Sequence, residues 1–318
     1  MRSALRNASG LFPLPHETQN KGEYSHMIRS IYAAVAASSL IATAAGAQST
    51  DVEEALPAGQ PETVFDGDFI SIGLGAGFGA SYSGSDNYNL NVLPIVQASI
   101  AGIDINPRAA GLAIDLIPDA DEGISFSAGP MFRLRNDRAD IDDINDEVVE
   151  LYGELDRAIE VGASLGISKP KVLNPFDSLS VSVDAAWDVN GAHGGMFVSP
   201  SVTYFTPLSR GTAASLSLST TFIDDDFADY YFTVPQIVNV APDDMFLPAF
   251  EADGGMQSYG VNLLLAQDLN GDITDGGLSL IGLGGWSKLV GDASDTPFTS
   301  IRGDNDQFFV ALGVGYTF

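Results

Sequence analysis

Residues that could catalyse a reaction or bind a metal are scarce in this chain of 318 residues. It has no cysteine, and of its three histidines only His193 lies beyond residue 47. An esterase would need that histidine beside a serine and an acid. However, His193 sits in the glycine-rich stretch 190–195, which is typical of a turn. Because zinc is bound mainly by Cys and His, the sequence predicts no catalytic residue, no cofactor, no zinc site and no enzyme.

The stretch Asp268–Asp272 resembles the start of a calcium-binding loop. Such a loop needs glycine at its sixth position and glutamate at its twelfth, where this chain has Ile273 and Ser279. The Asn-Gly and Gly-Gly pairs here are typical of hairpin turns. We interpret the stretch as a turn and predict no metal site; weak cation binding, here or at Asp224–Asp226, is the alternative.

Two further groups of residues could take part in binding. Arg302-Gly303-Asp304 matches a common adhesion tripeptide in a predicted loop, a match that arises easily by chance. Arg133, Arg135, Arg157 and Lys169 are rare cations in an acidic chain. If they face an interior, they need carboxylate partners to offset the cost of burial, or they shape the selectivity of a pore. We favour structural pairing.

The composition favours alternating strands over membrane-spanning helices. Hydrophobic residues make up 45% of the chain, charged residues only 18%, and the mean hydropathy is slightly positive at +0.12. Yet there is no run of apolar residues long enough for a helical span. High apolarity without long apolar runs is typical of strands with one apolar face.

The amino-terminal part has the pattern of an export signal. Met27 is followed by Arg29, an apolar alanine-rich stretch at 31–44 and the cleavage pattern Ala45-Gly46-Ala47. We therefore predict a signal peptide at 27–47, with translation starting at Met27 and residues 1–26 as a leader outside the fold. Residues 48–65 are polar, and we predict a disordered periplasmic lead-in before a barrel at 66–318.

The charge of the predicted mature chain excludes one class of partner. Residues 1–47 hold four basic and two acidic residues, so that the remainder has 10 basic and 40 acidic residues and a net charge of −30. A chain of this charge is not expected to bind the phosphates of nucleic acid. The charge suits a hydrated acidic surface, cation accumulation or a saline habitat.

Alternation of large apolar and small residues recurs along the chain, which predicts an all-β protein. The last stretch shows it best: every second residue from Phe308 to Phe318 is large and apolar, and the last is aromatic, as in the closing strands of bacterial outer-membrane barrels. The predicted strands cover 69–82, 90–100, 112–116, 124–134, 159–167, 179–189, 196–204, 214–222, 230–234, 259–265, 278–286 and 308–318. Since bacterial barrels have even strand numbers, we predict about twelve strands in an antiparallel outer-membrane β-barrel; a two-sheet sandwich is the alternative.

The segment from Asn136 to Asp156 differs from the rest of the chain. It contains nine acidic residues, and apolar residues recur in it at intervals of three and four. This spacing predicts a short acidic helix, which could cap the rim, plug the lumen or dock a partner. Counting strands from a periplasmic amino terminus places it on the periplasmic side, where it would be the docking candidate.

Several motifs, in order along 66–318, resemble the MltA-interacting protein (MipA) and OmpV family of outer-membrane proteins. They are Tyr-Ser-Gly-Ser-Asp-Asn-Tyr at 82–88 followed by a proline, Gly-Pro before Arg133, the aromatic piece 228–234, Leu-Pro-Ala-Phe at 247–250, and Gly-Asp-Ala-Ser-Asp-Thr-Pro at 291–297. The motif positions are Tyr82, Gly84, Ser85, Asp86, Tyr88, Pro94, Gly129, Pro130, Gly291, Asp292, Pro297 and Phe318. Thr233 and Thr296 depart from the Gly and Ser that are usual in the family.

The resemblance implies an outer-membrane barrel in contact with lipid and lipopolysaccharide, without catalytic residues. Some members of the family are described as scaffolds that bring a lytic murein transglycosylase together with a peptidoglycan synthase. Others are described as porin- or adhesin-like. We therefore expect a scaffolding protein, with a small cation-preferring porin or an adhesin-like barrel as the alternatives.

Overall fold

The computed structural model describes residues 63–120, 123–236 and 246–318. The predicted leader at 1–26 and signal peptide at 27–47 lie outside these residues, as does most of the lead-in at 48–65. The end of that lead-in forms a short 3-10 helix, η1 (Val64–Asp66). Within the described residues, no helix is long and apolar enough to cross a membrane.

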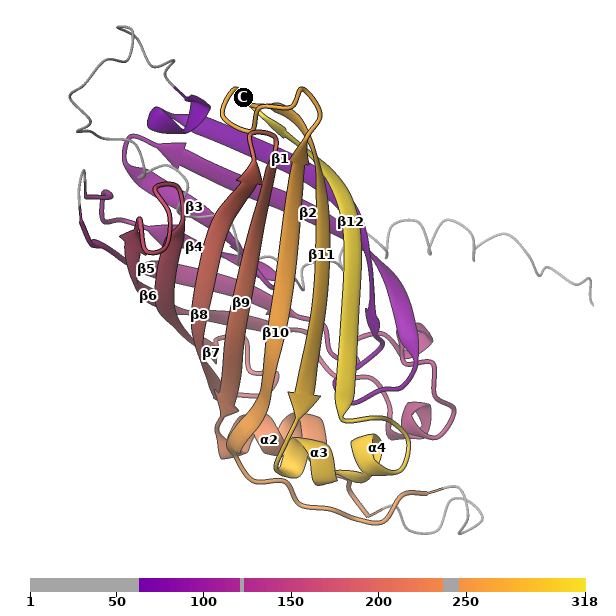
Figure 1. Ribbon diagram of the computed structural model, residues 1–318. Helices are drawn as coiled ribbons and strands as arrows, with labels where there is room; N and C mark the ends of the chain where they lie inside the picture. Colours follow the sequence, from indigo (N-terminus) through magenta and orange to yellow (C-terminus); the bar gives the residue numbers. More distant parts are fainter. Residues whose placement is uncertain (1–62, 121–122, 237–245) are drawn as a thin grey trace, which may run out of the picture.

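The wall is a closed antiparallel sheet of twelve strands, as predicted (Figure 1). The strands are β1 (Phe69–Ala80), β2 (Tyr88–Ile100), β3 (Ile103–Arg108), β4 (Gly111–Asp115), β5 (Ser125–Arg135), β6 (Ala158–Pro170), β7 (Ser178–Asp188), β8 (Met196–Ser209), β9 (Thr212–Ile223), β10 (Gly255–Asp268), β11 (Gly277–Leu289) and β12 (Asp306–Thr317). Pairing of β1 with β12 closes the ring. Beyond the last pair of this ladder, the backbone N–H of Phe318 donates to the Ile70 carbonyl at 2.9 Å.

Although the predicted number of strands is confirmed, two of the predicted assignments are wrong. The strand predicted at 230–234 is mostly the end of a helix, α2 (Asp225–Phe232), which begins because the Asp224 side chain accepts from the Phe227 N–H. The missing strand is β3, which is only six residues long and contains Pro107. The two errors cancel in the count.

The outer face of the barrel is the apolar one. Phe308 and Leu312 of β12 and Phe318 directly after it are 58%, 72% and 65% exposed, while Ala311 of β12 is buried. The inner face of β1 is a row of glycines, and a Cβ on Gly77 would lie 2.7 Å from a methyl carbon of Leu93. Side chains of the neighbouring strands therefore lie over the bare inner face of β1.

Outward-facing aromatic residues gather toward the two ends of the barrel, with aliphatic residues between them. Near one end lie Phe78, Tyr88, Phe222, Tyr259, Trp286 and Phe308; near the other lie Phe126, Tyr204, Tyr316 and Phe318. An apolar band flanked by two aromatic girdles is the pattern of a transmembrane barrel.

The two ends of the barrel differ in their connections (Figure 1). The end that carries the carboxyl terminus has mostly short turns, at 101–102, 116–124, 171–177, 210–211 and 269–276. The opposite end has the long connections at 136–157, 224–254 and 290–305, together with 81–87 and 189–195. These hold α2, the 3-10 turns η2 (Ile141–Asp143) and η3 (Val149–Tyr152), and the short helices α3 (Asp292–Asp295) and α4 (Pro297–Ser300).

The acidic segment at 136–156 corrects our prediction in two ways. It forms the separate turns η2 and η3, because Asn145 between them adopts a left-handed φ of 57° and Gly153 ends the second with φ 84°. Its buried apolar residues are Ile144 and Val149, whereas Leu151 of the predicted stripe is 44% exposed. Because β3 adds a strand before it, the segment lies at the end opposite the start of β1 and the end of β12, not at the end we predicted.

Candidate functional site

The lumen on the β5–β9 side is lined by small hydroxyl side chains. Because residues alternate between the two faces of a strand, the serines between the outward apolar residues all point inward. They join neighbouring strands through hydroxyl–hydroxyl hydrogen bonds: Ser182 with Ser201, Ser199 with Thr221 and Thr203 with Ser217, each at 2.8 Å. Polar contacts thus bind these strands together on the inside, while apolar side chains face outward.

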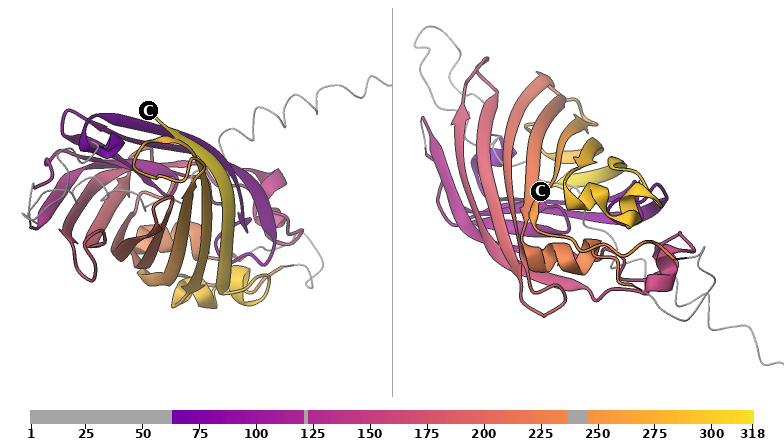
Figure 2. Two further views of the ribbon diagram at one scale, coloured as in Figure 1. Left: turned by 45° about the horizontal axis from the view of Figure 1, so that its top comes forward. Right: turned by 90° about the horizontal axis from the view of Figure 1, so that it is seen from below.

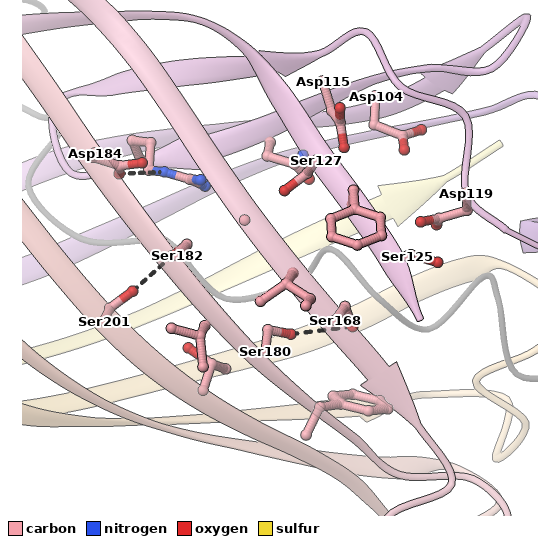
Figure 3. A pocket seen from close by; sticks show the side chains of 18 of the residues that line it. Asp104, Asp115, Asp119, Ser125, Ser127, Ser168, Ser180, Ser182, Asp184 and Ser201 are labelled. Carbon is pink, nitrogen blue, oxygen red and sulfur yellow. Dashed lines mark hydrogen bonds and ion pairs between the residues drawn. The ribbon is translucent and has the colours of Figure 1, made fainter. Parts of the chain in front are cut away.

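A cavity of about 110 Å³ lies among these serines and carries four carboxylates (Figure 3). Asp104, Asp115, Asp119 and Asp184 line it. Its one arginine, Arg108, is 2.7 Å from Asp184. Four carboxylates against one guanidinium give the cavity an excess of negative charge that would attract cations.

Between this cavity and the end of the barrel that carries the long connections lies a charged cluster centred on the buried Glu160. Glu160 is 2.8 Å from Arg135, 3.5 Å from Arg133 and 3.2 Å from His193, and its side chain has no exposed surface. The predicted pairing of Arg133 and Arg135 with a carboxylate is therefore confirmed. Arg157 and Lys169 lie outside the cluster and are exposed.

His193 is in a turn, as predicted, but its side chain is buried among aromatic rings. It is 5% exposed, and its ring lies 4.8 Å from that of Phe227. The guanidinium of Arg135 stacks over the same Phe227 ring at 4.6 Å, and that of Arg133 over Phe197 at 4.7 Å. These cation–π contacts add to the ion pairs in stabilising the buried charges.

Helix α2 lies at this end of the barrel, across part of the mouth and over this cluster (Figures 1 and 2). Its residues Phe227 and Phe232 are each 1% exposed, and they pack in one apolar cluster with Met131 of β5 and Phe197 of β8. Arg138, 4% exposed, donates to the Tyr231 carbonyl of the same helix. The lumen is thus filled on this side by tightly packed side chains.

A second apolar cluster joins the other connections into a cap. Tyr82, Ile144, Val149 and Phe298 are each no more than 3% exposed and come from three different connections. Arg302 of the connection 290–305 and the buried Asp146 of the connection 136–157 form an ion pair of 2.8 Å within this cap. Burial raises the pKa of Asp146, but the hydrogen bonds from Arg302 and from two backbone N–H groups outweigh it and lower the pKa.

Most of the predicted motif positions meet in this cap, although they lie about 200 residues apart in sequence. A Cβ on Gly84, whose φ is +96°, would lie 2.1 Å from Thr299 Oγ1. Ser85 is fully buried and forms a β-bridge with Gly303. Asp292 accepts from the Asp253 N–H at 2.7 Å. These residues hold connections together; sequence motifs alone give no sign that they touch.

The other motif positions and candidates are distributed over the wall and turns. A Cβ on Gly129 would lie 1.9 Å from the Ile114 carbonyl oxygen, so glycine permits this close approach of β4 to β5. In the stretch resembling a calcium loop, Asp268 instead accepts from three backbone N–H groups at 270–272. Arg302 is paired in the cap, so the tripeptide at 302–304 does not project as a free loop. Among the residues that the structure describes, no group of three or more potential ligands could hold a metal ion.

Comparison with known proteins identifies the family of the chain. Residues 72–318 match the family of MltA-interacting protein MipA, and no curated protein matches the chain. Among solved structures, an outer-membrane channel of Pseudomonas putida F1 has a TM-score of 0.38 at 13% identity, covering 83% of this chain and all of that one. The Pseudomonas putida toluene transporter TodX has a TM-score of 0.35 at 9% identity, covering 80% of this chain and 90% of that one. OprD of Pseudomonas aeruginosa has a TM-score of 0.29 at 11% identity, covering 79% of this chain and 94% of that one.

The family match spans β2 to β12 and most of β1, and it includes every connection of the cap. It therefore covers both the wall and the features that close the mouth. The chain belongs to the MltA-interacting protein MipA family and is an outer-membrane β-barrel.

Proposed function

We propose that this protein is a scaffold that anchors a murein-remodelling enzyme to the outer membrane. The observation that carries the proposal is the closed mouth, where Met131, Phe197 and Phe227 are each 1% exposed. A barrel whose mouth is packed beneath α2 and crossed by the cap offers binding surfaces rather than a wide pore, although a cavity of about 380 Å³ remains beneath the cap. The name of the family, MltA-interacting protein, supports a partner of this class.

The partner would bind at the end of the barrel where β1 begins and β12 ends. Outer-membrane barrels have short periplasmic turns and longer extracellular connections, and the short turns of this barrel lie at that end. We therefore assign this end to the periplasm, after export by the predicted signal peptide at 27–47. The apolar belt would contact lipid and lipopolysaccharide.

The β6–β7 turn at 171–177 offers a suitable docking surface. Asp177 fixes its shape by accepting hydrogen bonds at 2.7–3.0 Å from three backbone N–H groups, those of residues 172–174. The Tyr204 hydroxyl donates to the same carboxylate at 2.7 Å. The turn then exposes 79% of Leu173 and 56% of Phe176. Exposed apolar side chains on a rigid turn are suited to anchor a protein partner.

A pull-down tests this proposal directly. The double variant Leu173→Ser/Phe176→Ser in full-length protein should capture a lytic murein transglycosylase roughly tenfold less well, or worse, since anchors of this kind contribute about 2 kcal/mol or more. The matched control is Leu151→Ser, which removes an exposed leucine at the opposite end and should leave capture unchanged. Equal capture by both variants would exclude the turn, and no capture by the unaltered protein would exclude the scaffold.

A narrow cation-preferring pore is the second candidate. It is favoured by the excess of carboxylates in the lumen, namely Asp104, Asp115, Asp119 and Asp184 against Arg108. Conduction would require the cap to move, because α2 and the connections of the cap lie across the described mouth. Conductance of the refolded protein in a planar bilayer distinguishes the two candidates: steady cation-selective openings would favour the pore, and silence from folded protein would favour the scaffold.

A further inference from the structure

The wall of the barrel is not paired along its whole height. Of the thirteen residues of β2, only Ala98–Ile100 pair with β3 in the described sheet, whereas twelve residues of the same strand pair with β1 on its other edge. The remaining edge of β2, from Tyr88 to Val96, faces the β3–β4 hairpin without a ladder. We call this stretch the seam.

Two prolines end the ladder at the seam. The Ser81 N–H donates to the Asn87 carbonyl, so odd-numbered residues of β2 bond β1 and even-numbered residues direct their backbone groups toward β3. Pro94 is one of these even-numbered residues. On β3, residues 103 and 105 bond β2, and the next in that alternation is Pro107. Both prolines lack the N–H that would continue the ladder.

Beyond its last pair with β2, the hairpin bends into the barrel. Pro107 is buried and lines one apolar cavity of about 30 Å³ with Leu93 and Ile95, which are inward-facing residues of β2. Arg108, next to the hairpin turn, is 2.7 Å from Asp184 on β7, across the lumen. The tip of the β3–β4 hairpin therefore lies in the lumen, behind β2. In the wall itself, no described strand is paired with the edge of β2 along the seam.

A large cavity lies behind the seam. Its volume is about 380 Å³, and its lining includes Asn89 and Asn91 of β2 on one side and Ala110 of the hairpin turn on the other. Deeper in the barrel, Arg133 and Arg135 line it as well. The Nε atom of Arg133 is buried and makes no hydrogen bond, although it lies 3.5 Å from the Glu160 carboxylate. This volume is that of an ordinary small-ligand pocket. Because the lining also holds Asp137, Asp140 and Asp143, it offers polar groups of both charges to a ligand.

The seam opens within the apolar belt. Leu90 and Val96 lie opposite Phe78 and Ile72 of β1, which face outward and are exposed. Open sheet edges do not occur in contact with hydrocarbon, because free N–H and C=O groups there cost several kcal/mol each; they occur only where they line a polar or water-filled space. An edge of this kind, with lipid outside and a polar cavity inside, therefore requires an occupant that suits both.

We propose that the seam is a lateral binding site for a membrane amphiphile, with its polar headgroup in the cavity and its acyl chain passing between β2 and the hairpin into the bilayer. An extended peptide adding a strand to β2 is the less favoured occupant, because Pro94 breaks the row of donors at its centre. The apolar exposed residues Leu90, Val92 and Val96 of β2 suit an acyl chain.

The absence of cysteine makes a site-specific test straightforward. The variant Asn91→Cys, labelled with a small fluorophore, reports on the cavity behind the seam. Asn262→Cys is the matched control, since Asn262 also faces inward but lies on β10, which is paired on both edges. In vesicles of phospholipid brominated on the acyl chain, the label at residue 91 should lose most of its fluorescence, and the label at residue 262 should keep it.

Restoring the two backbone N–H donors that Pro94 and Pro107 lack tests whether these prolines keep the seam unpaired. In the Asn91→Cys background, Pro94→Val/Pro107→Val should reduce quenching by brominated lipid to the level of the residue 262 control, whereas Pro200→Val on β8 should not. Equal quenching at residues 91 and 262, or unchanged quenching in the double proline variant, would overturn the proposal. So would quenching at residue 91 by aqueous iodide but not by brominated lipid, or native mass spectrometry showing a peptide instead of a lipid on the purified barrel.

Discussion

Glu160 on β6 lies opposite Arg133 in the β5–β6 ladder, yet its shortest ion pair, 2.8 Å, is with Arg135, two residues further along β5. The carboxylate thus lies between two guanidinium groups, with His193 as a third partner at 3.2 Å. One carboxylate compensates two buried cations. This cluster supports the helix that closes the mouth, because Arg135 also stacks on Phe227 of α2.

Removing the charge of Glu160 should strongly destabilise the barrel. Glu160→Gln would leave the largely buried Arg133 and Arg135 without their nearest counter-charge, at a cost of up to roughly 3–5 kcal/mol. The measurement is urea unfolding in lipid vesicles, followed by tryptophan fluorescence. Asp306→Asn is the control: it breaks the exposed 2.9 Å pair with Lys288 and should change stability little. Similar losses in the two variants would contradict the role given to burial.

Acid should loosen the cap before the wall. Asp146 has a pKa below its ordinary value of 3.8 in the folded state, so its contribution to stability is complete above that value. It is lost as the pH falls through the lower, folded-state pKa. Limited proteolysis between pH 7 and pH 3 with an acid-tolerant protease should therefore show cleavage within 136–157 appearing only below about pH 4. In Asp146→Asn, which has no carboxylate to protonate at this position, cleavage within 136–157 should be the same over the whole pH range. Cleavage that still begins only below about pH 4 in this variant would contradict the role assigned to Asp146.

A side chain at Gly84 should disrupt the contact between the first and last connections. Gly84→Ala combines a left-handed φ with a 2.1 Å approach to Thr299 Oγ1, and we expect a loss of about 1–3 kcal/mol. Gly153→Ala separates the two effects, since its φ is +84° but nothing lies within 4 Å of its Cβ. The companion change Thr299→Ala should recover part of the loss at Gly84 and none at Gly153, as measured by thermal unfolding.

Opening the cap should reveal the charge of the lumen. Phe227→Ala removes a ring that is 1% exposed from the mouth, and such truncations cost roughly 3–5 kcal/mol of packing. In planar bilayers we expect silence from the unaltered protein and brief cation-selective openings from this variant. Adding Asp104→Asn/Asp119→Asn should shift the reversal potential toward that of a non-selective pore. Anion-selective openings would contradict the role assigned to these carboxylates.

The wall could be predicted from the sequence because period-2 alternation sends each large apolar residue to the lipid. Strand β3 could not, since Ile103 and Ile105 alternate for too few residues before Pro107. The segment 230–234 was wrongly predicted to be a strand, because Tyr230, Phe232 and Val234 fall on every second position by chance, at the end of helix α2. The signal that could have corrected it was Asp224, followed by Asp225 and Asp226, an N-cap pattern for a helix.

The interior was less accessible to sequence reasoning. The pairing of Arg133 and Arg135 with a carboxylate was predictable in kind, because buried cations need partners. The identity of that partner was not, because Glu160 lies across a long connection whose path no periodicity reveals. The seam depends on the backbone of Pro94 being directed toward β3 and that of Pro107 toward β2. Only the register of β2 against β3 can show this.

The bond between Phe318 and Ile70 joins residues at opposite ends of the folded domain, and its consequence concerns the time course of assembly. Every other wall ladder joins strands that are consecutive in sequence, but the ring closes only when the last strand meets the first. Contacts between such distant residues form slowly, since a long loop must be closed before they contribute. Until then, β1 and β12 each have an edge without its partner strand. We therefore expect closure to be the rate-limiting and most aggregation-prone step of insertion, so that chaperones which cover those edges would speed maturation most.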